Sequence, residues 1–140
     1  MEYGKFKDKY VLRLEKGEEI VSTIKKFCEE KGVKLARVSG IGAVDRAEIG
    51  LFDTKNKEYH SKELRGDHEI TSLNGNISTK DGETYLHLHI NLSDEEYNTK
   101  GGHLSSAVIS GTGEIVIDII DGTIEREFNE EVGLNLFKFI

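Results

Sequence analysis

The stretch Tyr85-Leu86-His87-Leu88-His89-Ile90-Asn91-Leu92 alternates between aliphatic residues and aromatic or polar ones. A period of two is typical of a β-strand with one face toward the core, because successive side chains on a strand point to opposite faces. The four aliphatic residues therefore predict the core face, and His87 and His89 lie together on the other. The turn signal Lys80-Asp81-Gly82-Glu83 just before this stretch predicts a hairpin.

Further segments with the same period lie on both sides of this strand. They predict strands over residues 10–14, 34–39, 47–52, 58–64, 69–77, 105–110 and 114–120. We interpret Gly40-Ile41-Gly42 as a turn joining two of these strands, and we place a second junction at Gly111-Thr112-Gly113 and a polar loop over residues 93–102. Short turns between consecutive strands favour antiparallel pairing.

One segment, residues 18–31, has the period of a helix instead. Its apolar residues recur at the spacing of a single helical stripe, and they are Ile20, Val21, Ile24, Phe27 and Cys28. Two glutamates open the segment, and Gly32 follows it as a suitable residue to end a helix. One main helix packed on a mostly antiparallel sheet predicts an α+β fold, and we expect residues 1–140 to form a single domain.

The composition excludes several classes of protein. With one cysteine the chain has no internal disulfide, which suits a reducing, cytoplasmic setting. No apolar run approaches the roughly 20 residues of a membrane-spanning helix. The net charge is −7, and residues 71–140 carry 12 acidic side chains against 4 basic ones. This balance disfavours a surface for nucleic-acid phosphates and favours attraction of a divalent cation.

Three histidines form the pattern with the most specific chemistry. His87 and His89 share one strand face, and Gly101-Gly102 allows the backbone before His103 to approach closely and return a third imidazole to the same point. Three neutral imidazoles suit a divalent transition metal with one open coordination position. Zinc, copper, nickel, iron and cobalt all accept such ligands. The alternative is that these are ordinary surface or hydrogen-bonded histidines.

The remaining candidates have simpler interpretations. Cys28 lies on the apolar helix stripe, which predicts a buried packing role rather than a nucleophile. His60 and His68 lie in polar stretches and are predicted to be solvated. Near the C-terminus, four glutamates between residues 125 and 131 indicate a solvated face. The apolar residues of 134–139 indicate a segment that docks on another surface, and in one interpretation that surface belongs to a neighbouring subunit.

An ordered set of motifs across nearly the whole chain resembles a known family. The motifs are Arg13-Leu14-Glu15 with Gly17-Glu18, Val38-Ser39-Gly40-Ile41-Gly42-Ala43, Gly66-Asp67-His68-Glu69-Ile70-Thr71-Ser72-Leu73-Asn74-Gly75-Asn76, His87-Leu88-His89-Ile90-Asn91-Leu92-Ser93-Asp94 and Gly101-Gly102-His103-Leu104. They resemble the plant-and-prokaryote-conserved (PPC) domain, in its stand-alone archaeal and bacterial form. The same domain forms the C-terminal part of the plant AT-hook nuclear-localised proteins.

The resemblance implies an α+β domain that assembles as a homotrimer and holds a metal, usually zinc, on His87, His89 and His103. The family is often labelled DNA-binding, but in plants the AT-hook makes that contact in the minor groove. This chain has no proline and no Arg-Gly-Arg, and Asp67 replaces the arginine of the plant Gly-Arg-Phe-Glu-Ile motif. Nucleic acid is therefore a weakly supported partner.

Two functions of different classes follow. The first is a metal-holding trimer that binds a small ligand or a protein partner without catalysis. The second is a metal-dependent hydrolase or lyase in which the three histidines hold a reactive water. Such an enzyme needs a general base within hydrogen-bond reach of that water, and Glu69 and Asp94 are the candidates that the sequence offers.

Overall fold

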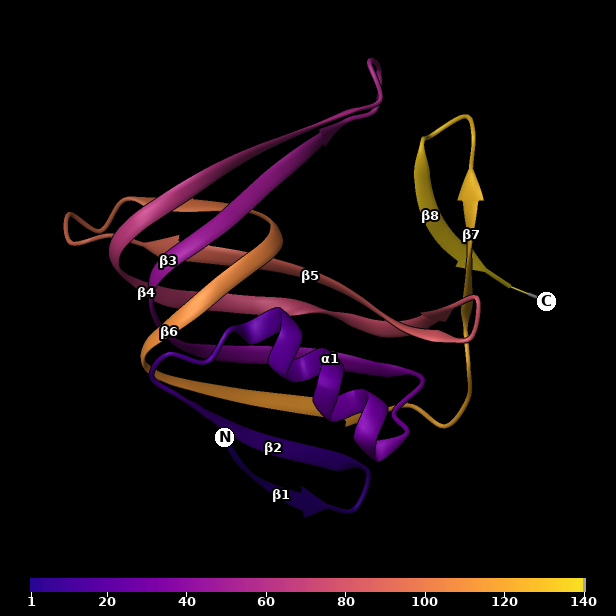
Figure 1. Cartoon of the computed structure of the whole chain (residues 1–140), viewed down its shortest axis with the longest axis horizontal. Coiled ribbons are helices and arrows are strands. Elements are labelled where there is room, and N and C mark those ends of the chain that lie inside the picture. The colour runs from indigo at the N-terminus through magenta and orange to yellow at the C-terminus, as the bar shows by residue number, and fades with distance from the viewer. Residues whose placement is uncertain (140) are drawn as a thin grey trace.

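The computed structural model describes residues 1–139 and contains eight strands and one helix in that range. Figure 1 shows their arrangement. In chain order they are β1 (Glu2–Phe6), β2 (Lys9–Glu15), α1 (Ile20–Lys31), β3 (Ala36–Asp53), β4 (Glu58–Lys80), β5 (Glu83–Ser93), β6 (Thr99–Ile119), β7 (Glu125–Asn129) and β8 (Leu134–Lys138). Within this described range, no helix is long and apolar enough to cross a membrane.

All eight strands belong to one sheet, which closes on itself in its middle. The order is β1-β2-β6-β3-β4-β7-β8, and β5 pairs with both β4 and β6. The four strands β6, β3, β4 and β5 therefore form a ring in which every neighbouring pair is antiparallel. Closure removes exposed edges from these strands and leaves the sheet with an inner face and an outer face.

The longest strands bend instead of ending at their glycines. Gly40-Ile41-Gly42 lies inside β3, and Gly111-Thr112-Gly113 lies inside β6, so the predicted turn and strand junction are wrong. Register shifts mark bulges at these places, including one between Gly40 and Gly42 of β3. Gly42 has φ +152°, and a Cβ there would lie 2.2 Å from the Thr112 carbonyl oxygen. A bulge bends a strand without breaking its pairing. The period of the sequence and its glycines do not by themselves distinguish a bulge from a turn.

The predicted α+β class is wrong, because the structure is a β-rich fold. The helix α1 has 12 residues, whereas β3, β4 and β6 have 18, 23 and 21. Segments predicted as separate short strands are continuous, and part of the predicted loop, residues 99–102, already belongs to β6. Because the sheet curls on itself, residues such as Val44, Ile49 and Leu64 are buried within the ring of strands. The helix covers part of this core but does not form a second layer of the fold.

The helix itself forms where its apolar stripe predicts. The Glu19 side chain accepts hydrogen bonds from the backbone amides of Val21 and Ser22, which caps the first turn, and the helix ends at Gly32. Its buried residues are Ile20, Ile24, Phe27 and Cys28. This face packs on β5 and β6, and it joins the single hydrophobic cluster of the described residues.

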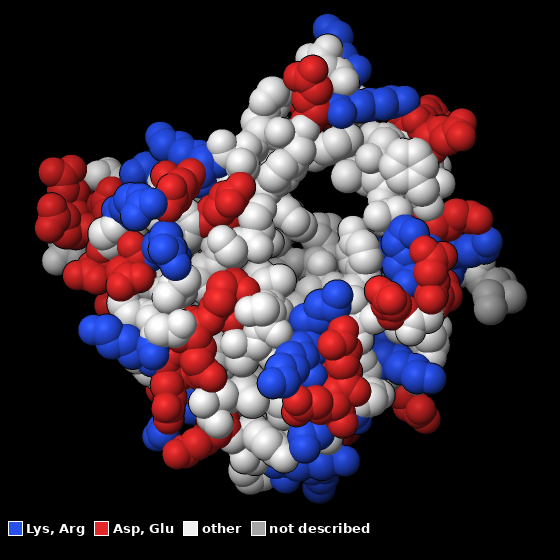
Figure 2. Space-filling model, in the orientation of Figure 1, with Lys and Arg blue, Asp and Glu red and all other residues white. Residues whose placement is uncertain are grey.

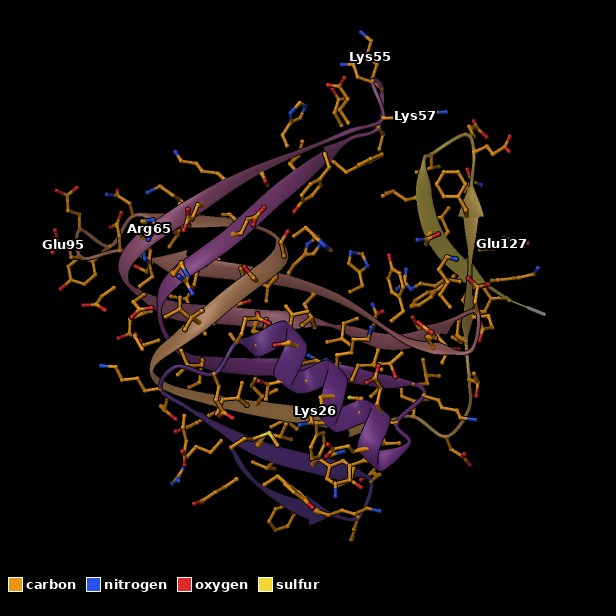
Figure 3. The ribbon with its side chains drawn as sticks, viewed as in Figure 1. Lys26, Lys55, Lys57, Arg65, Glu95 and Glu127 are labelled. Carbon is orange, nitrogen blue, oxygen red and sulfur yellow. The ribbon has the colours of Figure 1, made fainter. Side chains whose placement is uncertain are left out.

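Two hairpins project from the ring and approach each other (Figure 1). The β3–β4 hairpin forms an arm, and β7–β8 forms a second hairpin, on which Glu127, Glu130 and Glu131 are exposed, as the sequence predicts. Lys57 at the tip of the arm donates a hydrogen bond to the Glu130 carbonyl oxygen in the β7–β8 turn at 2.5 Å. Figure 3 shows Lys57 reaching from the arm toward that hairpin. The two hairpins thereby enclose a space beside β5.

Candidate metal centre

Strand β5 presents two of the three predicted ligands on one face. His87 and His89 are two residues apart, and their ring centroids lie 5.1 Å apart. On the opposite face Leu88, Ile90 and Leu92 are 1%, 3% and 0% exposed, so the core holds the strand in this orientation. A slip of one residue would exchange the two faces, and the burial of these aliphatic side chains opposes it.

The third histidine arrives through the pairing of β5 with β6. His103 is the direct cross-strand partner of His89, and it also pairs with Gly50 of β3. Side chains of directly opposite residues in a sheet lie on the same face with their Cβ atoms about 5 Å apart. His103 consequently joins the other two imidazoles, with ring centroids 5.4 Å from His87 and 5.7 Å from His89.

Close backbone contact at Gly102 makes this approach of β6 possible. A Cβ on Gly102 would lie 2.6 Å from the Gly50 carbonyl oxygen, well inside the normal contact distance. Tyr59 of β4 then packs over Gly50 with its ring edge-on to His103, at 5.9 Å between centroids. The Tyr59 hydroxyl and the Ser105 hydroxyl share a hydrogen bond of 2.8 Å. Neighbouring groups thus support the orientation of His103.

The histidine environment favours neutral imidazoles. Burial, followed by Arg126 and the other two histidines, lowers the pKa of His87 to about 4. Burial and His89 also lower the pKa of His103. An imidazole binds a metal through the lone pair of a neutral ring nitrogen, so these shifts keep the ligand form present at neutral pH.

The three side chains fit a transition metal by geometry and by donor type. One ring nitrogen from each lies within 4.8 Å of the others. Three nitrogens bound to zinc at 2.0–2.1 Å with tetrahedral angles lie about 3.4 Å apart, so small rotations of the rings close the gap. Within residues 1–139, the ring of His68 forms a hydrogen bond. The ring nitrogens of the triad form no hydrogen bond with this part of the chain. Three imidazoles without protein partners, two of them half-buried and His89 exposed, are free to bind a metal.

A cavity of about 490 Å³ opens beside the triad. The arm contributes Leu51, Phe52 and Tyr59 to its wall, and Leu134, Asn135 and Leu136 come from β8. Figure 2 shows an opening at this place, rimmed mostly by uncharged atoms. Within the described residues the lining contains no aspartate or glutamate and one arginine, Arg126. The volume falls in the range of small-molecule sites.

The other candidate residues lie away from this cavity. Asp94 accepts hydrogen bonds from the backbone amides of Glu96 and Asn98 and pairs with Lys100 at 3.6 Å, so it organises the β5–β6 loop. Glu69 pairs in register with Ser93, beyond His89 along β5. Neither residue lines the cavity. The structure therefore does not bring either predicted general base to the histidines.

The remaining histidines and the cysteine have separate positions. His60 is exposed, as predicted, and lies 3.9 Å from Glu58. His68 is 8% exposed, so its predicted solvation is wrong, and its Nδ1 donates to the Gly66 carbonyl oxygen at 2.7 Å. Cys28 is fully buried, which confirms its packing role, and burial raises the pKa of its thiol to about 12.

Two residues that the sequence patterns did not predict belong to this site. Tyr85 lies two residues before His87, so the same alternation that selected the histidines places it on their face. Arg126 occupies β7 between two glutamates, and no local pattern distinguishes it from a solvated residue. Its position in the cavity depends on the contact between β7 and β4, which are joined in register at one point, Thr79 with Glu125.

A curled, partly closed antiparallel sheet with a histidine triad at its closure defines a class of small β domain. The model of the Plants and Prokaryotes Conserved (PCC) domain matches residues 1–121, and the chain belongs to this family, as the sequence motifs predicted. No match was found among curated proteins.

Several solved structures are similar over nearly the full chain. A candidate DNA-binding protein from Bacteroides thetaiotaomicron is 38% identical with a TM-score of 0.96, and the match covers 99% of this chain and 96% of that one. A metal-containing protein from Archaeoglobus fulgidus is 40% identical with a TM-score of 0.87 and the same coverage. A PPC protein from Pyrococcus horikoshii is 34% identical with a TM-score of 0.86, covering 99% of this chain and 94% of that one.

Proposed function

We propose that this protein holds a divalent transition metal on His87, His89 and His103 and binds a small ligand in the adjacent cavity. The convergence of three imidazole nitrogens within 4.8 Å, without protein hydrogen-bond partners in the described chain, carries the proposal. The description of the similar Archaeoglobus fulgidus protein as metal-containing supports it. A metal bound there would supply a Lewis acid with an open coordination position toward the cavity.

Zinc is the metal that we propose for this site. Its filled d shell imposes no geometric preference, so three histidines on a curved sheet can bind it after small rotations of their rings. Copper, nickel, iron and cobalt accept the same ligands, and zinc is distinguished from them by elemental analysis of protein purified without added metal.

Ligand binding is favoured over hydrolysis by the composition of the cavity wall. A hydrolase or lyase needs a general base close to the reacting water. Asp94 and Glu69, the two carboxylates considered for that role, do not line the cavity. Apolar and aromatic side chains form most of the wall, as in a site that encloses an organic molecule.

We also propose that the protein assembles as a homotrimer. The single chain exposes apolar side chains on the two projecting hairpins, including Leu51 at 66% and Phe128 at 57%. We infer that these exposed side chains pack against the other subunits of the trimer. Light scattering coupled to size-exclusion chromatography tests the mass, and a monomer at micromolar concentration contradicts the trimer.

DNA binding is not part of the proposal. The face of the molecule in Figure 2 mixes basic and acidic side chains over the same elements, and the net charge is −7. Binding to duplex DNA relies on clustered cations that neutralise phosphates, and it weakens steeply with salt. Fluorescence anisotropy with a duplex at about 50 mM salt is expected to show no binding. A salt-sensitive complex would restore the DNA-binding role.

Metal uptake tests the main proposal directly. We expect about one metal per chain, and we expect His103→Ala to weaken binding by roughly 100-fold or more, since even loss of a supporting group costs 10–100-fold. His60→Ala is the matched control, because His60 is exposed and outside the triad. Titration of metal-free protein with Co²⁺, followed by its visible absorption, measures both variants. Equal affinities for wild type and His103→Ala would contradict the proposal.

A further inference from the structure

Arg126 is a buried cation without a carboxylate partner in the described chain. Its side chain is 8% exposed, and no aspartate or glutamate among residues 1–139 forms a salt bridge with it. Its guanidinium stacks between the rings of Tyr85 and Phe137, at 4.6 and 4.3 Å from their centroids. A buried charge is costly unless it is paired or fully hydrogen-bonded, so this arrangement needs a reason.

Three neutral groups hold the guanidinium in a fixed orientation. Nε donates to the Ser78 hydroxyl, Nη1 to the Asn135 carbonyl oxygen and Nη2 to the Asn76 side-chain oxygen, each at 2.8 Å. A guanidinium has five N–H groups. Two N–H groups therefore remain without a partner from the described residues, one on each terminal nitrogen. A guanidinium can bind the two oxygens of one carboxylate with donors from two of its nitrogens.

The same contacts place Arg126 next to the histidine triad. Asn76, which binds Nη2, is the cross-strand partner of His87, and Ser78 is the partner of Tyr85. Tyr85, His87 and His89 follow one another on one face of β5, at steps of about 6.7 Å between Cα atoms. The guanidinium thus lies over the residue next to His87 in this row, and its charge contributes to the lowered pKa of His87.

The space between these groups belongs to a single cavity. Arg126, Tyr85 and the three histidines all line it, and its other walls are largely apolar. A molecule in this space would meet a cation at one end and the histidine site at the other. Its middle would contact Leu51, Leu134 and Leu136.

We propose that Arg126 binds the carboxylate of a small organic acid whose other end lies at the histidine site. This inference deepens the proposed function and rests on it only for the second end of the ligand. An organic carboxylate fits better than inorganic phosphate, because two free donors and apolar walls match a planar anion with a hydrocarbon part.

The test uses three probes on the metal-free protein, so that its result is independent of metal binding. Butanoate, 1-butanol and inorganic phosphate are titrated while the Nε–H signal of Arg126 is followed by ¹⁵N NMR. We expect butanoate to shift this signal saturably and to bind at least about tenfold more tightly than 1-butanol, as charge-assisted hydrogen bonds predict. We expect phosphate to bind more weakly than butanoate.

Variants and cobalt loading show whether the metal proposal or the carboxylate inference fails. Arg126→Gln is expected to weaken butanoate binding by about tenfold or more, and Arg126→Lys, which keeps the charge without the planar pair of donors, to recover part of it. Arg65→Gln is the matched control, because Arg65 is an exposed arginine at the end of the molecule away from the β7–β8 hairpin (Figure 3). The comparison of the three probes on the wild-type protein remains a test even where a variant does not fold.

Three results would overturn the inference. They are equal affinity for butanoate and 1-butanol, an unchanged affinity in folded Arg126→Gln, and phosphate binding as tightly as butanoate. If cobalt does not bind while butanoate still shifts the Arg126 signal, the metal proposal fails and the carboxylate site stands. If cobalt binds and butanoate does not act on Arg126, the carboxylate inference fails alone.

Discussion

His89 and His103 are direct partners across the β5–β6 pair, although 13 residues separate them in the sequence. This pairing is the contact that closes the ring of strands, so the histidine site lies at the closure of the fold. Its geometry therefore depends on the same backbone contacts that stabilise the sheet. Changes to those contacts are expected to alter stability and metal affinity together.

Gly102→Ala is expected to disturb both properties. The added Cβ would lie 2.6 Å from the Gly50 carbonyl oxygen, so β6 must move away from β3 next to His103. We expect a loss of about 1–3 kcal/mol in the free energy of unfolding, together with weaker cobalt binding. Gly111→Ala is the control, because a Cβ there meets Ala43 at an ordinary 3.6 Å. Equal behaviour of the two variants in urea unfolding would contradict the close contact at Gly102.

Acidification is expected to destabilise the metal-free protein. The pKa of His87 is about 4 in the folded protein and near 6.5 in the unfolded chain. Above pH 6.5 both states are neutral and His87 has no effect on stability. As the pH falls from 6.5 toward 4 the unfolded chain takes up the proton first, so stability decreases, and it levels off below pH 4.

Urea midpoints measured from pH 7.5 to 4 in the presence of a chelator follow this effect. His87→Gln is expected to reduce the slope in that window, since the substitution removes the titrating group. His60→Gln is the control substitution, because His60 is exposed and lies outside the triad. A slope identical in all three proteins would mean that His87 is as easily protonated in the folded state as in the unfolded chain.

Cys28 is expected to be unreactive in the native protein. The side chain is fully buried, and burial raises the pKa of its thiol to about 12, so little thiolate is present at neutral pH. We expect modification by Ellman's reagent to be roughly 100-fold slower in native protein than in urea, because it requires local opening. Fast, complete modification under native conditions would show that α1 detaches readily from the sheet.

Leu88 and Leu51 allow the same substitution to be compared at a core position and at an exposed position. Leu88 is 1% exposed in the core behind the histidines, and Leu51 is 66% exposed on the arm. Leu88→Ala is expected to cost about 2–5 kcal/mol in the free energy of unfolding. Leu51→Ala is expected to change it by less than about 0.5 kcal/mol in the monomer. A large effect of Leu51→Ala that depends on protein concentration would locate Leu51 in a subunit interface.

Local patterns predicted the pieces of this fold better than its class. The alternation around His87 predicted β5, its core face and the shared face of two histidines, and the apolar stripe predicted α1. The α+β class failed because the predicted main helix is a single 12-residue element beside strands of 18 to 23 residues, and glycines inside β3 and β6 had made these strands look shorter. A turn and a bulge share the same residues, and only the pairing of neighbouring strands decides between them.

The site shows the same division between local and long-range information. The spacing of His87 and His89, and the glycines before His103, indicated the triad, because strand period and close backbone approach are local properties. Arg126 comes from β7 and Tyr59 from β4, and much of the remaining cavity wall comes from β3 and β8. These parts of the chain meet the histidines only in the folded protein. The sequence by itself determined which side chains can bind a metal. Tertiary structure decided what lies beside them, since contacts between distant strands depend on register and closure, and no local pattern encodes these.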